Sequence, residues 1–330
     1  MQPDKTIRST CPYCGVGCQV LLNTRDDRIV RIDAPFDAAP NYGRLCVKGR
    51  FGADYVHHPS RLTAPLIRRV PQVPGQRQPA GADDWREATW DEALDLVVAR
   101  LLDLRQRYGP DSITANACAK ATNEDNYLLQ KYLRGVLGTN NVDHCARLCH
   151  AGSVSGLQLA IGSSAMSNSI AEMASLECFM VIGSNTAETH PVIATFLKQA
   201  VRRNGARLIV VDPRQTEMTR FADLWLRERP GTDTALFNAM AHVVVKEKLY
   251  SPAFIAERTE GFAEYVESLE EKTPEWAEGI TGVPAEDIRR AARMYANAGS
   301  AAMYWGMGIS QSTHGTDNTL TLTNLALMCG

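Results

Sequence analysis

Four cysteines near the N-terminus constrain this chain more than any other feature of its sequence. Cys11, Cys14 and Cys18 lie within eight residues, and Cys46 follows after 27 further residues. Three closely spaced thiolates and a fourth from a distant loop can ligate the four irons of a [4Fe–4S] cluster. A structural zinc site more often uses two similar cysteine pairs, and buried cysteines without a ligand are the other alternative. The unequal spacing favours a [4Fe–4S] cluster on these four residues.

Lys48 lies two residues after Cys46, close in sequence to the predicted cluster. Most lysines are solvated surface residues, and that is the simpler interpretation of this one. The functional alternative is a cation held against the cluster, where its charge would tune the reduction potential or connect the cluster to a second redox group. Spacing alone does not decide between the two.

Composition and charge exclude several classes of protein. The chain has 330 residues, of which 45% are hydrophobic and 22% charged, so we expect a soluble globular protein of about two domains. The 35 Lys and Arg nearly balance the 37 Asp and Glu, which argues against a nucleic-acid partner. No apolar run reaches the roughly 18 residues of a membrane span. Nine cysteines without a secretory signal indicate a reducing, cytoplasmic setting, where clustered cysteines bind metal or do redox chemistry.

The N-terminal part of the chain is predicted to be a small β-rich module that holds the cluster. Residues 18–24 and 28–33 alternate apolar and polar side chains on either side of Arg25-Asp26-Asp27, a pattern typical of a β-hairpin. We expect this module to span residues 1–62. Residues 69–84 are rich in Pro and Gly and have no hydrophobic period, which indicates a loop.

The rest of the chain alternates helices and strands. Thr89 and Glu92 form a predicted capping box at the start of an amphipathic helix. Residues 178–182, 191–203 and 207–211 read as a strand, a helix and a strand, which is one βαβ unit. Further helices are predicted at 123–137, 232–247, 284–297 and 316–329, and further strands at 112–117 and 301–305.

This alternation predicts the α/β class, with layered domains around mainly parallel sheets. We expect part of a first α/β domain over residues 63–142 and a second α/β domain over residues 143–330. Three cysteines, Cys118, Cys178 and Cys329, lie in apolar strand or helix contexts and are expected to be core residues.

A second group of residues that could do chemistry lies between positions 143 and 153. This short stretch contains two cysteines, two histidines and an arginine, which are Cys145, Cys149, His144, His150 and Arg147. Small cysteines buried in a helix are the simpler explanation. Gly152-Ser153, shortly after Cys149-His150, is however typical of a loop that leads into a helix with its N-terminus at position 153. A thiol before such a terminus is favoured as a thiolate, which suits a soft metal.

Several polar and glycine residues are predicted at the carboxyl ends of strands, where α/β sheets bind ligands. Gly183 follows the first strand of the βαβ unit and Asp212 follows the second, where an acidic group suits a ribose hydroxyl. A helix start near Asp233 and a turn with Gly306 and Gly308 could receive phosphate oxygens. The chain has no GxGxxG motif, so a simple NAD site is not indicated. Taken singly, each of these residues is more often a turn or a cap.

Three motifs together resemble one family. Cys-Pro-Tyr-Cys-Gly-Val-Gly-Cys at 11–18, Leu-Cys-Val-Lys-Gly-Arg at 45–50 and Cys-Ala-Arg-Leu-Cys-His at 145–150 are similar to the catalytic subunit of molybdenum- or tungsten-dependent formate dehydrogenases. These enzymes belong to the bis-(molybdopterin guanine dinucleotide) oxidoreductases. The resemblance runs from the first cysteine to the last residue, with further similar stretches at 139–143, 183–191, 211–214 and 305–308.

The resemblance implies roles for individual residues. The cysteine quartet would hold the cluster, and Lys48 would lie between the cluster and one pterin. Cys149 would ligate the metal, and His150 beside it would accept a proton or orient the substrate. In related nitrate reductases the residue after the metal-ligating cysteine is generally not histidine, so His150 separates the two groups. The other residues expected at the cofactor are Gly183, Asn185, His190, Asp212, Arg214, Asp233, Gly306, Met307 and Gly308.

The function that the resemblance implies is the oxidation of formate to carbon dioxide at a molybdenum or tungsten bis-pterin centre. Electrons would pass through the pterin and Lys48 to the cluster, and then to an electron-accepting subunit or carrier protein. Two alternatives remain: a related oxidoreductase such as nitrate reductase, and a non-catalytic electron-transfer subunit like the large iron–sulfur subunit of respiratory complex I. Members of the family continue for roughly as much chain again, so these 330 residues are expected to form an incomplete catalytic unit.

Overall fold

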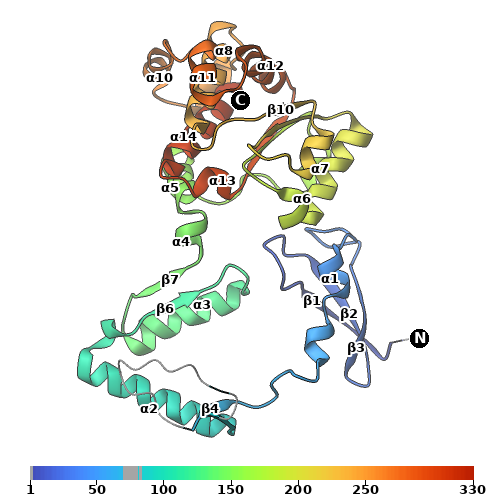
Figure 1. The fold of residues 1–330 in the computed structure, drawn as a ribbon, viewed down its shortest axis with the longest axis vertical. Helices are drawn as coiled ribbons and strands as arrows, with labels where there is room; N and C mark the ends of the chain where they lie inside the picture. The colour runs from blue at the N-terminus through green and yellow to red at the C-terminus, as the bar shows by residue number, and fades with distance from the viewer. Residues whose placement is uncertain (1–2, 70–80, 82–83) are drawn as a thin grey trace. The chain divides into compact units, whose positions relative to one another are not determined.

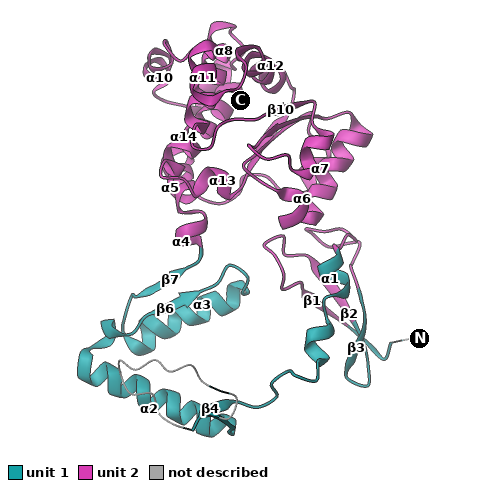
Figure 2. Cartoon of the chain, in the orientation of Figure 1, with its two compact units in different colours: residues 1–6, 23–32, 47–145 teal, residues 7–22, 33–46, 146–330 magenta. Residues whose placement is uncertain are grey.

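The computed structural model of the chain describes residues 3–69, 81 and 84–330 (Figure 1). The chain divides into two compact units (Figure 2). Unit 1 comprises residues 1–6, 23–32 and 47–145, and unit 2 comprises residues 7–22, 33–46 and 146–330. The loop predicted at 69–84 lies almost entirely outside the described residues.

The N-terminal strands form a three-stranded sheet in the order β1-β2-β3. They are β1 (Lys5–Thr10), β2 (Gln19–Arg25) and β3 (Arg28–Asp33). The predicted hairpin is confirmed, because β2 and β3 are joined only by Asp26 and Asp27. These two residues have φ angles of 49° and 56°, which a tight two-residue hairpin turn requires and which Asp tolerates better than most residues. The connection between β1 and β2 then carries three of the four N-terminal cysteines.

Unit 1 continues with short elements and two longer helices. In chain order they are α1 (Val47–Phe51), η1 (Asp54–His57), β4 (Leu66–Arg68), β5 (Trp85–Glu87), α2 (Trp90–Tyr108), η3 (Pro110–Ser112), β6 (Ala115–Ala117), α3 (Asn123–Lys131), the π-helix η4 (Tyr132–Leu137) and β7 (Val142–His144). The side chain of Thr89 caps α2 by accepting a hydrogen bond from Glu92 N, as the capping pattern predicts. Strands β6 and β7 pair in parallel.

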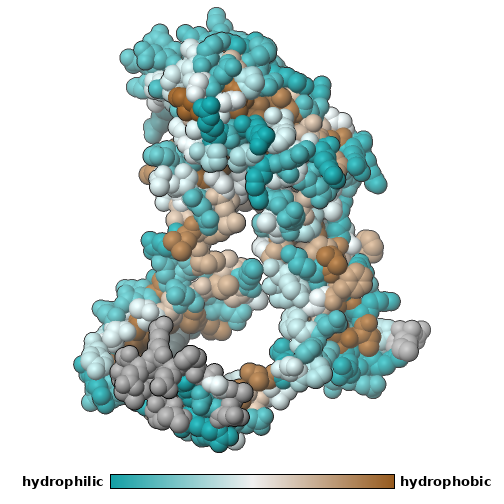
Figure 3. All heavy atoms as spheres, in the orientation of Figure 1, coloured by the Kyte–Doolittle hydropathy of each residue, from teal (hydrophilic) through white to brown (hydrophobic). Residues whose placement is uncertain are grey.

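The surface of the molecule mixes apolar residues with hydrophilic ones (Figure 3). Helix α2 has no buried residue, and Trp90, Leu94, Val97 and Leu102 on it are each at least half exposed. Among the described residues, no helix combines the length and the apolar character that crossing a membrane requires.

Unit 2 is built on a four-stranded parallel sheet in the order β10-β9-β8-β11. Its elements are α4 (Ala146–Cys149), α5 (Ala151–Ile161), η5 (Ala171–Ala174), β8 (Cys178–Ile182), α6 (Thr186–Thr189), α7 (Pro191–Asn204), β9 (Arg207–Val211), η6 (Glu217–Phe221), β10 (Leu224–Leu226), α8 (Asp233–Lys246), α9 (Pro252–Arg258), α10 (Phe262–Ser268), α11 (Pro274–Thr281), α12 (Ala285–Ala296), β11 (Ala301–Trp305), α13 (Met307–Ser310) and α14 (Gly315–Cys329). The predicted α/β class with a parallel sheet is confirmed.

The two faces of this sheet belong to different hydrophobic clusters. Met180 and Ile182 of β8 pack on one face with α8, α11, α12 and α14, while Phe179 and Val181 pack on the other with α7. This division follows from the two-residue period of a strand. The second cluster also contains Val16, which lies in the connection between β1 and β2. The cysteine-bearing loop is therefore anchored on the α7 face of the sheet.

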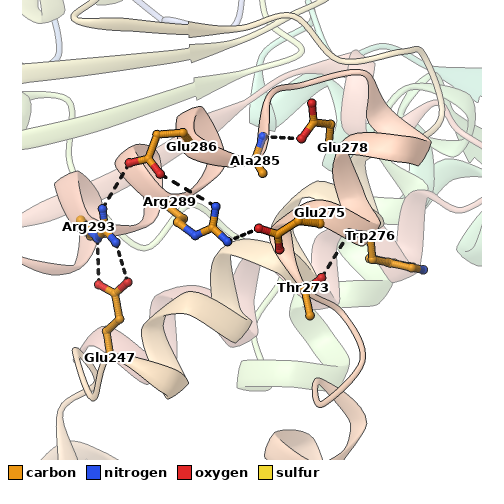
Figure 4. Close-up of polar contacts among 9 residues, drawn as sticks. All are labelled: Glu247, Thr273, Glu275, Trp276, Glu278, Ala285, Glu286, Arg289 and Arg293. Atoms are coloured by element: carbon orange, nitrogen blue, oxygen red, sulfur yellow. Dashed lines mark hydrogen bonds and ion pairs between the residues drawn. The ribbon is translucent and has the colours of Figure 1, made fainter.

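Charged side chains join the helices of the first face (Figure 4). Arg293 of α12 donates to both carboxylate oxygens of Glu247, which follows α8, at 2.8 Å each. Arg289 of α12 pairs with Glu275 of α11, and both arginines also pair with Glu286. These groups are partly or largely exposed, so solvent screens the ion pairs and they contribute little to stability. The apolar cluster beneath them holds the helices together.

Candidate functional site

The four N-terminal cysteines come together in unit 2. Three lie in the connection between β1 and β2, and Cys46 directly precedes α1. Cys11 N donates to Cys18 O at 2.9 Å, and Gly17 takes a φ of 68°, the left-handed conformation that glycine adopts without strain. Burial, together with the nearby Cys11, Cys14 and Cys46, raises the pKa of the Cys18 thiol to about 12. The structure thus gathers the predicted quartet around Cys18.

The arrangement of these sulfurs bears on which metal group they fit. Within the described ranges, no three His, Cys, Asp or Glu side chains are placed to bind one metal ion. A single tetrahedral zinc needs its four ligands at about 2.3 Å from one point. A cluster with a separate iron for each thiolate lets the sulfurs lie farther apart, so the quartet fits a [4Fe–4S] cluster better than zinc.

Asn41 holds the segment that carries the fourth cysteine, and the motifs did not reveal it. Its side chain is completely buried, accepts from Gln19 N at 2.8 Å and donates to Gln19 O at 3.0 Å and Arg44 O at 2.8 Å. Arg44 in turn stacks 3.7 Å above the ring of Phe196 and donates to Gln199 on α7. These contacts hold the loop before Cys46 next to β2, the strand that begins directly after Cys18.

Lys48 is the second residue of α1, in unit 1, and its side chain is exposed. Its predicted position between the cluster and a pterin stays a prediction.

Cys149 and His150 lie where α4 ends and α5 begins. Ser310 of α13 donates from its hydroxyl to Cys149 O at 2.7 Å and lies 3.2 Å from His150 Nδ1. Because Ser310 uses its proton on the carbonyl, its oxygen accepts from Nδ1–H, which leaves Nε2 of His150 unprotonated. Burial lowers the pKa of His150, so the neutral imidazole is favoured.

The helix that follows Cys149 begins earlier than the sequence indicates. The prediction places its N-terminus at Ser153, but α5 begins at Ala151 and the Ser153 hydroxyl accepts from Trp305 Nε1 at 2.8 Å. The expectation was wrong because Gly152 is helical rather than a loop residue. A Cβ at Gly152 would lie 2.8 Å from the backbone of Gly315, so this glycine allows α5 and α14 to pack closely.

An open groove of about 620 Å³ flanks this junction. It is lined by residues of α4, α5 and the segment that joins α13 to α14, among them Arg147, Leu148, Ala151, Ser310 and Thr313. Through this groove a small molecule can reach the junction between α4 and α5.

The glycines at the ends of β8 and β11 touch each other. A Cβ at Gly308 would lie 2.6 Å from Gly183 Cα, and one at Gly306 would lie 2.9 Å from Gly183 O. Gly308 N also donates to Gly183 O at 3.1 Å. The close approach of the two backbones therefore explains why glycine occupies positions 183, 306 and 308. The predicted contact of these glycines with phosphate stays a prediction. Met307 begins α13 and is 49% exposed.

Carboxylates gather at the carboxyl ends of β9 and β10. Asp212 is buried, and its carboxylate accepts from Arg214 N at 2.8 Å, while the Arg214 side chain is 72% exposed. Asp233, the first residue of α8, is also buried, and burial raises its pKa. Glu228, which the motifs did not indicate, is 5% exposed. Burial raises the pKa of Glu228 to about 8, and the charges of Asp233 and Asp212 add to the effect.

Two buried acceptors at this edge have no hydrogen-bond donor among the described residues. They are Asn185 Oδ1, before α6, and Glu228 Oε2, after β10. His190, before α7, bonds through Nδ1 to the Thr189 hydroxyl at 3.0 Å. A guanine offers N–H donors and a ribose offers hydroxyl donors, which are the groups these acceptors lack. The edge therefore fits the nucleotide part of a pterin dinucleotide.

One expectation about the remaining cysteines was wrong. Cys178 is completely buried and Cys329 is partly buried, but Cys118 is exposed, because β6 ends at Ala117 and the chain turns outward.

Two family models match the chain. Residues 61–330 match the molybdopterin oxidoreductase family, and residues 4–58 match the molybdopterin oxidoreductase Fe4S4 domain. These matches confirm the predicted cofactors, a [4Fe–4S] cluster and a molybdenum or tungsten molybdopterin.

Individual relatives match over nearly the whole chain. Formate dehydrogenase H of Escherichia coli is 44% identical over 99% of this chain and 45% of its own length. The alpha subunit of F420-dependent formate dehydrogenase 1 of Methanococcus maripaludis is 43% identical over 98% of this chain and 46% of its own. Among solved structures, acetylene hydratase from Pelobacter acetylenicus has a TM-score of 0.85 at 26% identity, covering 99% of this chain and 43% of that one. The chain thus spans a little under half the length of these relatives.

Proposed function

Because the chain belongs to the molybdopterin oxidoreductase family, we propose that the whole protein is a formate dehydrogenase catalytic subunit that oxidises formate to carbon dioxide. The observation that carries this proposal is the junction at Cys149 and His150. One serine, Ser310, contacts both the backbone carbonyl of Cys149 and the neutral imidazole of His150, next to an open groove. This pair would provide a metal ligand and a proton acceptor side by side.

The chain offers distinct places for the parts of the cofactor. Cys149 Sγ would ligate the metal, and the carboxyl edge of the sheet would hold the guanosine of the dinucleotide. The residues proposed at that edge are Gly183, Asn185, His190, Asp212, Arg214, Glu228, Asp233, Gly306, Met307 and Gly308. The bound molybdopterin supplies two-electron redox chemistry at its metal. The cysteines Cys11, Cys14, Cys18 and Cys46 would hold the cluster, which carries single electrons.

The residues of this chain would handle the substrate's proton. Formate oxidation yields carbon dioxide, one proton and two electrons. His150 Nε2 is the unprotonated nitrogen of a neutral imidazole, so it would accept the proton as a general base. Ser310 would keep the ring oriented during this transfer through its contact with Nδ1. Burial of the imidazole favours its return to the neutral form, after which the proton leaves toward solvent.

The electrons would leave by way of the N-terminal cluster. We infer that Lys48 lies between the cluster and one pterin, where its charge would stabilise added electrons. An electron-accepting subunit or carrier protein would take them from the cluster. The protein would act in the cytoplasm, where the thiolates of the cluster remain reduced.

Two other functions fit the family and are less well supported. A nitrate reductase is disfavoured by His150, whose proton-accepting nitrogen suits the oxidation of formate. A non-catalytic electron-transfer subunit is disfavoured because it would need neither the Cys149–His150 pair nor a ligand for the orphaned acceptors Asn185 and Glu228.

Activity and metal content of the full-length protein test the proposal. Purified without oxygen, it is expected to reduce a viologen dye with formate but not to oxidise reduced viologen with nitrate, and to contain iron together with molybdenum or tungsten. Cys149→Ala should abolish the formate reaction, while Cys329→Ala, at a cysteine outside both sites, should retain it. Iron without molybdenum or tungsten would instead support the electron-transfer subunit, and nitrate-dependent turnover would support a reductase.

A further inference from the structure

Two exposed cysteines of unit 1 follow directly on a pair of hydrogen-bonded strands. Strands β6 and β7 lie side by side in parallel (Figure 1), and their last paired residues are Ala117 and His144. The next residue is Cys118 on one strand and Cys145 on the other. Both cysteines are free and exposed, and neither belongs to the cluster quartet or to the proposed metal site.

The register places the two thiols on one face. In β6 and β7 the paired residues Asn116 and Asp143 are exposed, whereas the pairs on either side of them are half-buried. Because strand side chains alternate between faces, Cys118 and Cys145 continue the exposed face. Neighbouring strands lie about 4.8 Å apart, and a disulfide needs Cα atoms roughly 4.4–6.8 Å apart. The last pair of the ladder thus places the two cysteines on neighbouring segments of the chain, each one residue beyond it.

We propose that Cys118 and Cys145 form a redox-active dithiol, which low-molecular-weight disulfides oxidise to an intramolecular disulfide and which dithiol reductants restore. The site does not depend on the molybdopterin or on formate, so its test stands apart from that of the proposed function. It is a modification site on the segment that leads into α4 and Cys149.

Both sulfurs have polar contacts within unit 1. Cys145 Sγ lies 4.0 Å from His144 Nδ1, and Lys120 N donates to Cys118 Sγ at 3.4 Å. Asn126 holds the same residue in place, because its side chain accepts from Cys118 N at 3.3 Å and donates to Cys118 O at 3.2 Å. In the proposed exchange Cys118, which these contacts hold in place, attacks first, and Cys145 resolves the intermediate.

The exchange balances with oxidised glutathione as the oxidant. The Cys118 thiolate attacks one glutathione sulfur, which breaks the glutathione disulfide and releases one glutathione thiolate. The Cys145 thiolate then attacks the Cys118 sulfur of the mixed disulfide, forms the protein disulfide and releases the second glutathione thiolate. The two protein thiols lose two electrons, which reduce glutathione disulfide to two glutathione molecules, and their two protons pass to the departing thiolates.

Peptide mapping of the full 330-residue chain tests the proposal. The reduced chain, freed of reductant, is incubated with oxidised glutathione, alkylated and digested with trypsin. Cleavage after Lys and Arg places Cys118 on the peptide 108–120 and Cys145 on the peptide 135–147, apart from Cys149. The expected product is these two peptides joined, with two hydrogens fewer than their sum, and it should disappear after treatment with dithiothreitol.

Single variants distinguish the pair from random oxidation. Cys118→Ser and Cys145→Ser should each abolish the joined peptides and leave a glutathione adduct on the remaining cysteine. Cys329→Ser, at a cysteine outside the pair, should leave the yield unchanged. Two separate glutathione adducts on one unlinked wild-type chain, or either cysteine linked to a different partner, would overturn the proposal.

Discussion

At the scale of single residues, His150 carries the most direct prediction about catalysis. Burial lowers its pKa, so the base is neutral at physiological pH and becomes protonated only in more acidic solution. In the full-length protein, His150→Gln should reduce kcat for formate oxidation by about 10²- to 10⁴-fold, the usual contribution of a general base. It should also remove the acid limb of the pH–rate profile, which in the wild type lies below about pH 6.5.

The control for this prediction is Ser310→Ala, which removes the contact that orients the ring but keeps the base. Its loss of activity should be smaller, and the acid limb should remain. Unchanged kinetics in the His150 variant would exclude it as the proton acceptor.

Glu228 leads to a prediction about stability rather than catalysis. Its carboxyl group has a pKa of about 8 in the folded chain and about 4.3 when unfolded, so the unfolded chain loses this proton at lower pH. The free energy of unfolding is therefore highest below about pH 4.3, falls between about pH 4.3 and 8 by at most about 1.4 kcal/mol per pH unit, and levels off above pH 8. Urea unfolding of the cofactor-free chain at pH 5, 7 and 9 should show this decline.

Glu228→Gln should flatten the decline and raise the unfolding free energy at pH 9. The matched control, Glu264→Gln, replaces an exposed glutamate and should leave the pH dependence as it is. Equal slopes in the wild type and the Glu228 variant would show that this carboxyl does not titrate as proposed.

Residues with a local signature could be predicted from the sequence, and those defined by distant contacts could not. The cysteine quartet repeats a recognisable spacing, and Cys149-His150 lies in a motif. Asn41, Glu228 and Ser310 have no such pattern, because each acquires its role from a partner on another element. Only the folded chain shows that Ser310 reaches back over 160 positions to the Cys149–His150 junction.

At the scale of elements, the strands and helices of unit 2 were predictable because hydrophobic periodicity and capping residues agree. Strand β11 and helix α7 begin and end within one residue of the prediction, and Pro191 and Gly205 mark the ends of α7. The start of α5 was misplaced because a Gly-Ser pair usually signals a loop. Tertiary packing overrides that signal here, since α14 needs a helix without a side chain at Gly152.

The contact between the ends of β8 and β11 gives a prediction at this scale. In Gly308→Ala the new Cβ would lie 2.6 Å from Gly183 Cα, so the two turns would have to separate. We expect a loss of about 1–3 kcal/mol in unfolding free energy, the usual effect of overpacking. Urea unfolding measures it directly.

Gly279→Ala is the matched control, because this glycine is within α11 and a Cβ there would meet nothing within 4 Å. It should be neutral or stabilise the chain by up to about 1 kcal/mol, through helix propensity. If Gly308→Ala behaved in the same way, the close approach of the two turns would not be a requirement of the fold.

At the scale of the whole molecule, the length of the chain limits what it can do alone. It spans 45% of the length of Escherichia coli formate dehydrogenase H, and its groove beside Cys149 is open. Reconstituted without oxygen, the 330-residue chain is expected to bind a cluster, seen as about four irons per chain. It should show little or no formate-dependent dye reduction, and robust activity would contradict this expectation.

The family and the fold class could be predicted from the sequence because several separate motifs agree. The division into domains at residues 62 and 142 remains a prediction. It depends on long-range contacts, and the two units interleave segments from both sides of the first of these limits.

The strand order of the sheet also bears on when the protein can mature. Strands β8, β9 and β10 follow one another within 49 residues and can pair as they leave the ribosome, but β11 pairs with β8 only after 118 more residues have been translated beyond Ile182. The two glycine turns meet only once Gly308 has been synthesised. With the dinucleotide bound as proposed, its site is complete only after Gly308 has been translated.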